Sequence, residues 1–141
     1  MPTPSGPIQQ AAALPISNGK VCLVTSRGGR RWILPKGVVE TDWTPAECAV
    51  QEAWEEAGLV GDIEPEPIGT YTYQKDGRSH HVTVYRLRVT QILNTWPECE
   101  LRRRVWLAPA EALWRIDVPE LRSLLRDAFG QDDTVPERIA R

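Results

Sequence analysis

The sequence has few cysteines and no long apolar run. Cys22, Cys48 and Cys99 are odd in number and widely spaced, and none forms a C-x-x-C pair, which argues against a disulfide framework and a zinc site. No apolar stretch approaches the ~20 residues that cross a bilayer. The first residues lack the basic patch and apolar core of a secretory signal. We therefore expect a cytoplasmic protein with no membrane partner.

The sequence also lacks the positive excess of proteins that bind nucleic acid by bulk electrostatics. Lys plus Arg total 17, Asp plus Glu total 19, and the formal net charge is −2, so no nucleic-acid polymer is expected as a partner. The 141 residues are 41% hydrophobic and 26% charged, which is typical of one globular domain. We expect a flexible N-terminal tail at residues 1–8, a domain over residues 9–130 and a polar C-terminal tail at residues 131–141.

Hydrophobic patterning predicts short strands separated by helices. Asp76 and Gly77 are a hairpin-turn pair, and Pro35-Lys36-Gly37 is expected to interrupt a strand. Strands are expected at residues 11–14, 21–24, 31–34, 68–73, 82–93 and 104–107, and helices at residues 45–57, 109–114 and 119–129. This interleaving indicates a mixed sheet flanked by helices, in the α/β (α+β) class.

The clearest helix signal is at residues 45–57. Thr44 and Glu47 have the spacing of a capping box, Pro45 suits the first helical position, and Gly58 suits a left-handed C-cap. Trp54 lies on the flank of this helix and is expected in the core. One face carries small side chains, which let the helix backbone approach a neighbour closely: Ala46, Ala49, Val50, Ala53 and Ala57.

Three glutamates form another face of the same helix, because Glu52, Glu55 and Glu56 stand at i, i+3 and i+4. Like charges at i, i+4 cost about 0.2–0.5 kcal/mol. The negative end of the helix macrodipole adds ~0.3–1 kcal/mol against each of the last two. A divalent cation would reverse both penalties, and carboxylate ligands suit Mg²⁺ or Mn²⁺. An isolated E-x-x-E-E pattern is nevertheless also typical of a solvated surface.

The segment from Gly37 to Leu59 resembles the Nudix box, G-x5-E-x7-R-E-U-x-E-E-x-G-U, in which U is a bulky aliphatic residue. The matching residues are Gly37, Glu52, Glu55, Glu56, Gly58 and Leu59. Residues 31–37, 89–96 and 102–106 are similar to the diphosphoinositol-polyphosphate and diadenosine-polyphosphate phosphohydrolase branch. The resemblance covers about residues 10–115. It implies a Nudix-type α/β/α sandwich and a metal-dependent pyrophosphohydrolase.

Two positions depart from the box, since Trp43 replaces its glutamate and Gln51 replaces its arginine; Ala53 is also small for its slot. In the family those two charged residues commonly pair, so their joint absence leaves neither charge unpaired. Trp43 and Cys48 occupy the two positions of a hydrophobic staple. We predict that an apolar contact between them replaces the ionic brace.

The resemblance also implies roles for single residues. Glu52, Glu56 and the Gly37 carbonyl would hold Mg²⁺, with Mn²⁺ as an alternative. Glu55 or Glu56 would act as the catalytic base, and the sequence leaves this choice open. Cationic side chains are expected to bind the phosphates of a small-molecule substrate, because arginine matches phosphate oxygens bidentately. The candidates are Lys36, Arg30, Arg31 and Arg103.

Two further groups have an alternative interpretation. Arg102, Arg103 and Arg104 are either phosphate ligands or a solvated charge run on an edge strand. His80 and His81 are either acid or phosphate-binding groups or, as we expect, structural residues.

Three functional hypotheses remain at this point. The first is a Mg²⁺-dependent hydrolase of phosphoanhydride bonds in a nucleoside diphosphate linked to another moiety, a diadenosine polyphosphate or a diphosphoinositol polyphosphate. The second is a catalytically weak Nudix-like module that binds or senses a nucleotide, which Trp43 and Gln51 keep open. The third is an interaction domain whose acidic helix is fortuitous. Several family members form homodimers, so self-association is also considered.

Overall fold

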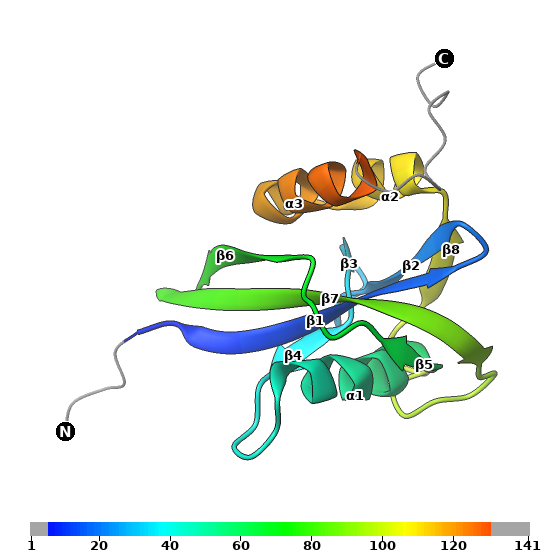
Figure 1. The fold of residues 1–141 in the computed structure, drawn as a ribbon, viewed down its shortest axis with the longest axis horizontal. Coiled ribbons are helices and arrows are strands. Elements are labelled where there is room, and N and C mark those ends of the chain that lie inside the picture. The colour runs from blue at the N-terminus through cyan, green and yellow to red at the C-terminus, as the bar shows by residue number, and fades with distance from the viewer. Residues whose placement is uncertain (1–5, 131–141) are drawn as a thin grey trace.

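The computed structural model describes residues 6–130, which form a sheet with α1 on one face and α2 and α3 on the other (Figure 1). The strands are β1 (Ile8–Ser17), β2 (Lys20–Thr25), β3 (Trp32–Ile33), β4 (Lys36–Val38), β5 (Leu59–Ile63), β6 (Gly69–Lys75), β7 (Arg78–Ile92) and β8 (Arg104–Leu107). The helices are α1 (Pro45–Ala57), α2 (Pro109–Arg115) and α3 (Pro119–Gly130). The predicted α/β/α sandwich with a mixed sheet is therefore confirmed.

The predicted helices are all present. The ends of α1 agree with the prediction, and α2 and α3 each extend one residue further. No helix within residues 6–130 is long and apolar enough to cross a membrane. Most of the predicted N-terminal tail and all of the C-terminal tail lie outside the described residues, and β1 already begins at Ile8.

Strand β1 is the centre of the sheet. It pairs in parallel with β7, from Ile8 opposite His80 to Ile16 opposite Arg88, whereas the other strand pairings are antiparallel. Its other edge pairs with β4 at residues 10–12 and with β2 at residues 16–17. Along this edge, β4 therefore pairs with the N-terminal part of β1, and β2 pairs with its C-terminal end.

Alternation along β1 divides its side chains between two cores. Ala12 and Leu14 face the core beneath α2 and α3, and Ala11 and Ala13 face the core against α1. Because the α1 residues in that second core are also small, the helix can lie close to the sheet. They are Cys48, Ala49, Ala53 and Ala57.

Three details differ from the predictions. The expected interruption after β3 is present at Leu34 and Pro35, but residues 36–38 then form β4, which pairs with β1 where β3 pairs with β2. Strand β5 was not predicted. It contains a bulge at Gly61, where a Cβ would come within 2.1 Å of the Arg88 carbonyl oxygen. Trp54 is 39% exposed and does not lie in the core.

The β6–β7 hairpin confirms the Asp76-Gly77 turn, since both residues have positive φ (52° and 76°), as a two-residue I′ turn requires. Its strands extend to the turn on both sides and are longer near it than predicted. Gln74 and Ser79, which interrupt the apolar pattern there, face each other through a side-chain hydrogen bond of 2.7 Å. Strand β3, in contrast, covers only two of the four residues expected.

Both ends of α1 are capped as predicted. The Glu47 N–H donates to Thr44 Oγ1 (3.1 Å), and the Thr44 N–H donates to Glu47 Oε1 (2.9 Å). Gly58 is left-handed, with φ of 68°. A Cβ at Gly58 would lie 2.7 Å from the Trp96 ring and 2.9 Å from the Arg104 guanidinium, so glycine is needed here for space as well as for conformation.

Gly58→Ala is therefore expected to destabilise the protein more than Gly77→Ala. Both residues have positive φ, but nothing lies within 4 Å of a Cβ at Gly77. Gly77→Ala should cost about 1 kcal/mol from backbone strain alone, and Gly58→Ala should cost ~1–3 kcal/mol more from overpacking. Urea unfolding of both variants measures the difference, and equal losses would contradict the packing argument.

Candidate active site

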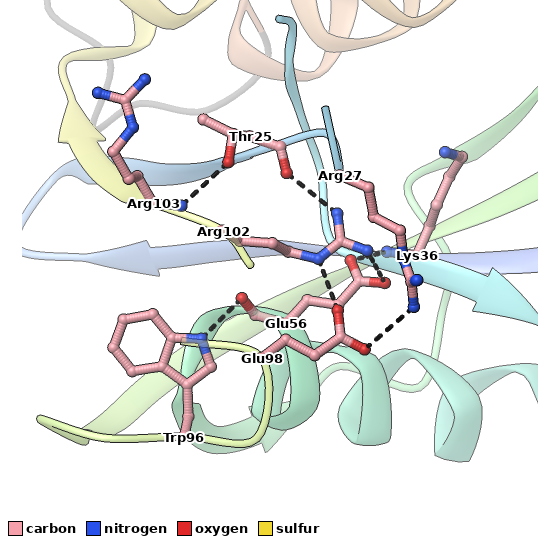
Figure 2. Close-up of polar contacts among 8 residues, drawn as sticks. All are labelled: Thr25, Arg27, Lys36, Glu56, Trp96, Glu98, Arg102 and Arg103. Atoms are coloured by element: carbon pink, nitrogen blue, oxygen red, sulfur yellow. Dashed lines mark hydrogen bonds and ion pairs between the residues drawn. The ribbon is translucent and has the colours of Figure 1, made fainter. Parts of the chain in front are cut away.

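The three glutamates of α1 differ in burial. Glu56 is 6% exposed, whereas Glu52 and Glu55 are partly exposed. Figure 2 shows the surroundings of Glu56: the end of β2, the start of β4 and the loop of residues 93–103 between β7 and β8 converge on it. This loop supplies Glu98 and Arg102, which lie beside Glu56.

Arg102 connects the three segments. Its guanidinium donates to Glu56 Oε2 (3.3 Å), to Glu98 Oε1 (2.7 Å) and to the Thr25 carbonyl (3.0 Å). The side chains of Arg102 and Glu56 are each 8% exposed, so this is a buried ion pair. Arg27 adds a longer ion pair to Glu98 (3.9 Å) from the exposed turn that follows β2.

Strand β4 contacts the glutamates through its main chain. The Lys36 N–H donates to Glu56 Oε1 (3.2 Å), so both carboxylate oxygens of Glu56 accept a hydrogen bond. A Cβ at Gly37 would lie 2.4 Å from Glu52 Oε2. Only glycine therefore allows the Glu52 carboxylate to lie against β4.

Burial and neighbouring charges shift the pKa values of Glu52 and Glu56. Burial raises the pKa of Glu52 to about 8, and the charges of Glu56, Glu55 and Glu98 act in the same direction. Burial also raises the pKa of Glu56, although the positive charge of Arg102 opposes this shift. Without a cation, Glu52 is therefore mostly protonated near neutral pH, and a cation that bound there would displace its proton.

These residues fit the divalent cation implied by the sequence. Within residues 6–130, no three His, Cys, Asp or Glu side chains form a group that could hold a metal ion. The implied ligand set needs only two carboxylates, Glu52 and Glu56, with the Gly37 carbonyl. Both carboxylates lie beside β4, and the Gly37 carbonyl accepts a weak bond from the Cys48 thiol (3.6 Å). Carboxylate and carbonyl oxygens are ligands that suit Mg²⁺ or Mn²⁺.

The C-terminal carbonyls of α1 are bonded by the chain that follows β7. The Glu98 N–H donates to the Glu55 carbonyl (3.0 Å), the Trp96 indole N–H to the Glu56 carbonyl (2.9 Å) and Arg104 to the Ala57 carbonyl (2.7 Å). Arg104 also stacks on the Trp96 ring at 4.1 Å. The positive charges of Arg102 and Arg104 therefore lie at the acidic, dipole-negative end of the helix. The electrostatic cost of the three glutamates is thus offset in part by the protein itself, and not solely by the divalent cation that the sequence analysis invoked.

The predicted phosphate-binding residues lie in different places. Lys36 has its ammonium 5.3 Å from the centre of the Tyr73 ring, and Arg31 lines the same small recess. Arg103 is exposed over the Trp32 ring at 5.7 Å. Arg30 is exposed in the turn before β3.

The structure also bears on the two groups that had alternative interpretations, the arginines at 102–104 and the histidines at 80 and 81. The edge-strand interpretation is wrong for Arg102, which is buried, and for Arg104, which caps α1. His80 stacks on Tyr73 with ring centres 4.8 Å apart, and His81 is bonded to Thr72 (3.2 Å). Both histidines thus belong to the β6–β7 hairpin.

The sequence reasoning missed Glu98 and Arg27. The i, i+4 spacing of Glu98 and Arg102 is a local signal for their pair, but nothing local shows that this pair reaches Glu56.

Trp43 is 42% exposed and lines a shallow groove with Val50 and Gln51. Its apolar contact with Cys48 stays a prediction.

Comparison with known proteins identifies similar chains. The family description "NUDIX domain" matches residues 7–128. Nudix hydrolase 4 of Arabidopsis thaliana is 38% identical over 95 residues, which cover 66% of this chain and 45% of that protein. Diphosphoinositol polyphosphate phosphohydrolase 3-beta of Bos taurus is 37% identical over 97 residues, covering 67% of this chain and 58% of that protein. The chain thus spans about half the length of these relatives.

A solved structure shows the same fold. The crystal structure of the C. elegans Ap4A hydrolase superposes with a TM-score of 0.71 over 89% of this chain and 98% of that one, at 20% identity. At this level of identity the likeness concerns the fold alone.

Arg102→Met is expected to destabilise the protein by about 3–5 kcal/mol, because the carboxylate of Glu56 loses its buried partner. Adding Glu56→Gln should recover part of this loss, since the side chain is then neutral. The Thr25 carbonyl and Glu98 still lack their donor in the double variant, so recovery should be incomplete. Urea unfolding near pH 7.5 without metal tests this. A double variant no more stable than Arg102→Met would contradict the ion-pair argument.

The metal-free protein should lose stability as the pH rises from about 4.5 to about 8. The pKa of Glu52 is 4.5 when unfolded and about 8 when folded, so the folded state binds more protons in this range and deprotonation disfavours it. Glu52→Gln should flatten the dependence of Tm on pH, whereas Glu100→Gln, at an exposed loop position, should leave it unchanged. If both variants keep the wild-type slope, Glu52 is not its source.

Proposed function

The chain belongs to the NUDIX domain family, and on this premise we propose that it is a divalent-metal-dependent hydrolase of phosphoanhydride bonds. The observation that carries the proposal is the position of two α1 carboxylates beside β4: Glu56 accepts a hydrogen bond from the Lys36 N–H, and Glu52 lies against Gly37. The proposed substrates are a nucleoside diphosphate linked to another moiety, a diadenosine polyphosphate or a diphosphoinositol polyphosphate. The relative named diphosphoinositol polyphosphate phosphohydrolase, 37% identical, supports the last of these.

The protein would hold Mg²⁺, or Mn²⁺, with Glu52, Glu56 and the Gly37 carbonyl. When bound, the cation would neutralise phosphate charge and lower the pKa of water. Arg102 and the Lys36 N–H fix the Glu56 carboxylate, so it is oriented before any ligand arrives. The Glu52 carboxylate lies against Gly37, which brings helix and strand ligands together.

We assign the base to Glu55, a choice that the sequence left open. Both oxygens of Glu56 already accept hydrogen bonds, from Lys36 and Arg102. Glu55 is partly exposed, and its place in the last turn is fixed by the Glu98 N–H on its carbonyl. Its carboxylate can therefore take a proton from an attacking water molecule, as a general base must.

Cationic side chains near β3 and β4 would hold the phosphates. Lys36 and Arg31 line one recess, Arg103 is exposed over Trp32, and Arg30 is exposed in the adjoining turn. The proposed partner is thus a small phosphorylated molecule and no nucleic-acid polymer. The cytoplasmic location and the homodimer stay predictions.

Family membership removes the hypothesis of a fortuitous acidic helix. The alternative of a catalytically weak binding or sensor module rests on Trp43 and Gln51. These residues line a groove on the flank of α1, apart from the Glu56–Arg102 pair, so the hydrolase is the proposal we favour.

Phosphate release from a panel of diphosphate compounds tests the proposal. The wild-type protein should turn over at least one compound with Mg²⁺, and EDTA should abolish the reaction. Glu55→Gln should lower kcat by ~10²–10⁴-fold because the base is lost. Glu56→Gln should lower it by orders of magnitude because a ligand is lost.

Glu100→Gln is the matched control, because it changes an exposed glutamate in the same loop as Glu98. It should retain wild-type turnover. Tight binding of a panel compound with no product over hours would contradict the hydrolase proposal and favour the sensor.

A further inference from the structure

Strand β6 has an unpaired edge. Among the described strands it pairs only with β7, and Figure 1 shows it beside β7 and below α3. Edge strands usually avoid pairing with another chain by means of prolines, bulges or charged side chains. Residues 69–75 contain no proline, their register with β7 is continuous, and Lys75 at the end is the only charged residue among them. This edge is therefore open to a further strand.

The β6–β7 turn determines which main-chain groups of β6 face the open edge. In a two-residue hairpin the pair that flanks the turn, here Lys75 and Arg78, exchanges main-chain hydrogen bonds. Hydrogen-bonded pairs then alternate along the two antiparallel strands. The N–H and C=O groups of Thr70, Thr72 and Gln74 therefore point away from β7, and the side chains of these three residues are exposed.

A second β6 strand in the antiparallel direction matches this edge. If the two copies of Thr72 lie opposite each other, Thr70 of each copy lies opposite Gln74 of the other, and all the outward-facing groups are paired. The same register places Tyr71 of each copy opposite Tyr73 of the other. Cross-strand pairs of aromatic residues and of threonines stabilise antiparallel sheets. The edge is thus complementary to itself about a twofold axis at Thr72.

An acidic cavity adjoins the start of β6. It lies between α3, β7 and the segment of residues 64–70, and its volume is about 630 Å³. Gly69 lines it and has no side chain to fill it. Its charged lining consists of four acidic residues and one arginine, namely Glu64, Glu66, Glu120, Asp127 and Arg86. The cavity therefore has an excess of negative charge.

The self-complementary register brings a positive charge to this cavity. Lys75 of one copy lies opposite Gly69 of the other copy. Its side chain lies on the same face of the sheet as Tyr71 and Tyr73, with which it lines one recess. Both tyrosines pack in the core beneath α3, and the cavity is on this face as well, because Leu124 of α3 lies over Gly69. Each copy thus directs one ammonium to the acidic cavity of the other.

We propose that two copies of this chain associate by antiparallel pairing of their β6 strands, with Lys75 of each copy in the acidic cavity of the other. The occupant of the edge is a second copy and not an unrelated strand, because the edge matches itself in main-chain groups and in charge. None of the interface residues is assigned a role in the proposed hydrolysis, so the inference is independent of the proposed function.

The oligomeric state of the purified protein tests the proposal. Sedimentation velocity over a range of protein concentrations should show a monomer–dimer equilibrium. Thr72→Pro removes an outward N–H and should abolish the dimer, while the monomer should still fold, since proline is tolerated where the N–H of an edge strand faces solvent. Thr72→Val is the matched control. It also removes the hydroxyl that is bonded to His81, but it keeps the N–H, so the dimer should persist.

A charge exchange tests the contact with the cavity. Lys75→Glu should raise the dissociation constant of the dimer by about 10-fold or more, because like charges then face each other. Adding Asp127→Lys should recover part of the affinity. Lys20→Glu makes the same change at an exposed position outside the interface and should leave the dissociation constant unchanged. Thermal melting checks that each variant is folded.

A wild-type protein that stays monomeric at every concentration would overturn the inference. Equal dimerisation of Thr72→Pro and Thr72→Val would also overturn it, because the interface would then lie elsewhere. If Thr72→Pro does not fold, the charge variants decide, and equal dissociation constants for Lys75→Glu and Lys20→Glu would contradict the proposal.

Discussion

The buried ion pair of Glu56 and Arg102 is the interaction on which the rest of the site depends. It joins α1 to the loop of residues 93–103, and through the Thr25 carbonyl it joins both to β2. A buried pair of this kind adds little net stability compared with apolar packing, but losing one partner is costly. Its main effect here is to fix the position of one carboxylate.

Glu52 and Glu56 have different surroundings, although both lie near the end of α1. Both oxygens of Glu56 accept hydrogen bonds, whereas burial and the neighbouring carboxylates raise the pKa of Glu52, one turn earlier, to about 8. Both carboxylates can lie beside β4 because α1 packs close to the sheet. Alanines on both sides of the α1–β1 interface, together with Gly37, leave room for the Glu52 carboxylate against β4. Larger residues at these positions would move α1 away from β4 and separate Glu52 from Gly37.

Local signals predicted most of the elements, and long-range contacts account for what was missed. The capping box of α1, the prolines that begin the other helices and the Asp76-Gly77 turn each act within a few residues. Strand β5 was missed because its Gly61 is required by the neighbouring strand and weakens the apolar pattern. The Glu56–Arg102 contact joins residues 46 positions apart. No spacing rule shows which of three adjacent arginines turns inward.

The acidic end of α1 is therefore stabilised by groups of the protein itself. Arg102 and Arg104, with the donors from Trp96 and Glu98, compensate the last turn of α1 before any cation binds. If the protein had left this charge uncompensated, cation binding would have to drive folding of the helix end, and part of the binding free energy would be lost in ordering it. Because that end is already ordered, a cation that bound beside Glu52 would displace a proton and would not have to fold the helix end. In the proposed hydrolase, the affinity for the cation would then depend on the carboxylates and on pH, and not on the stability of the fold.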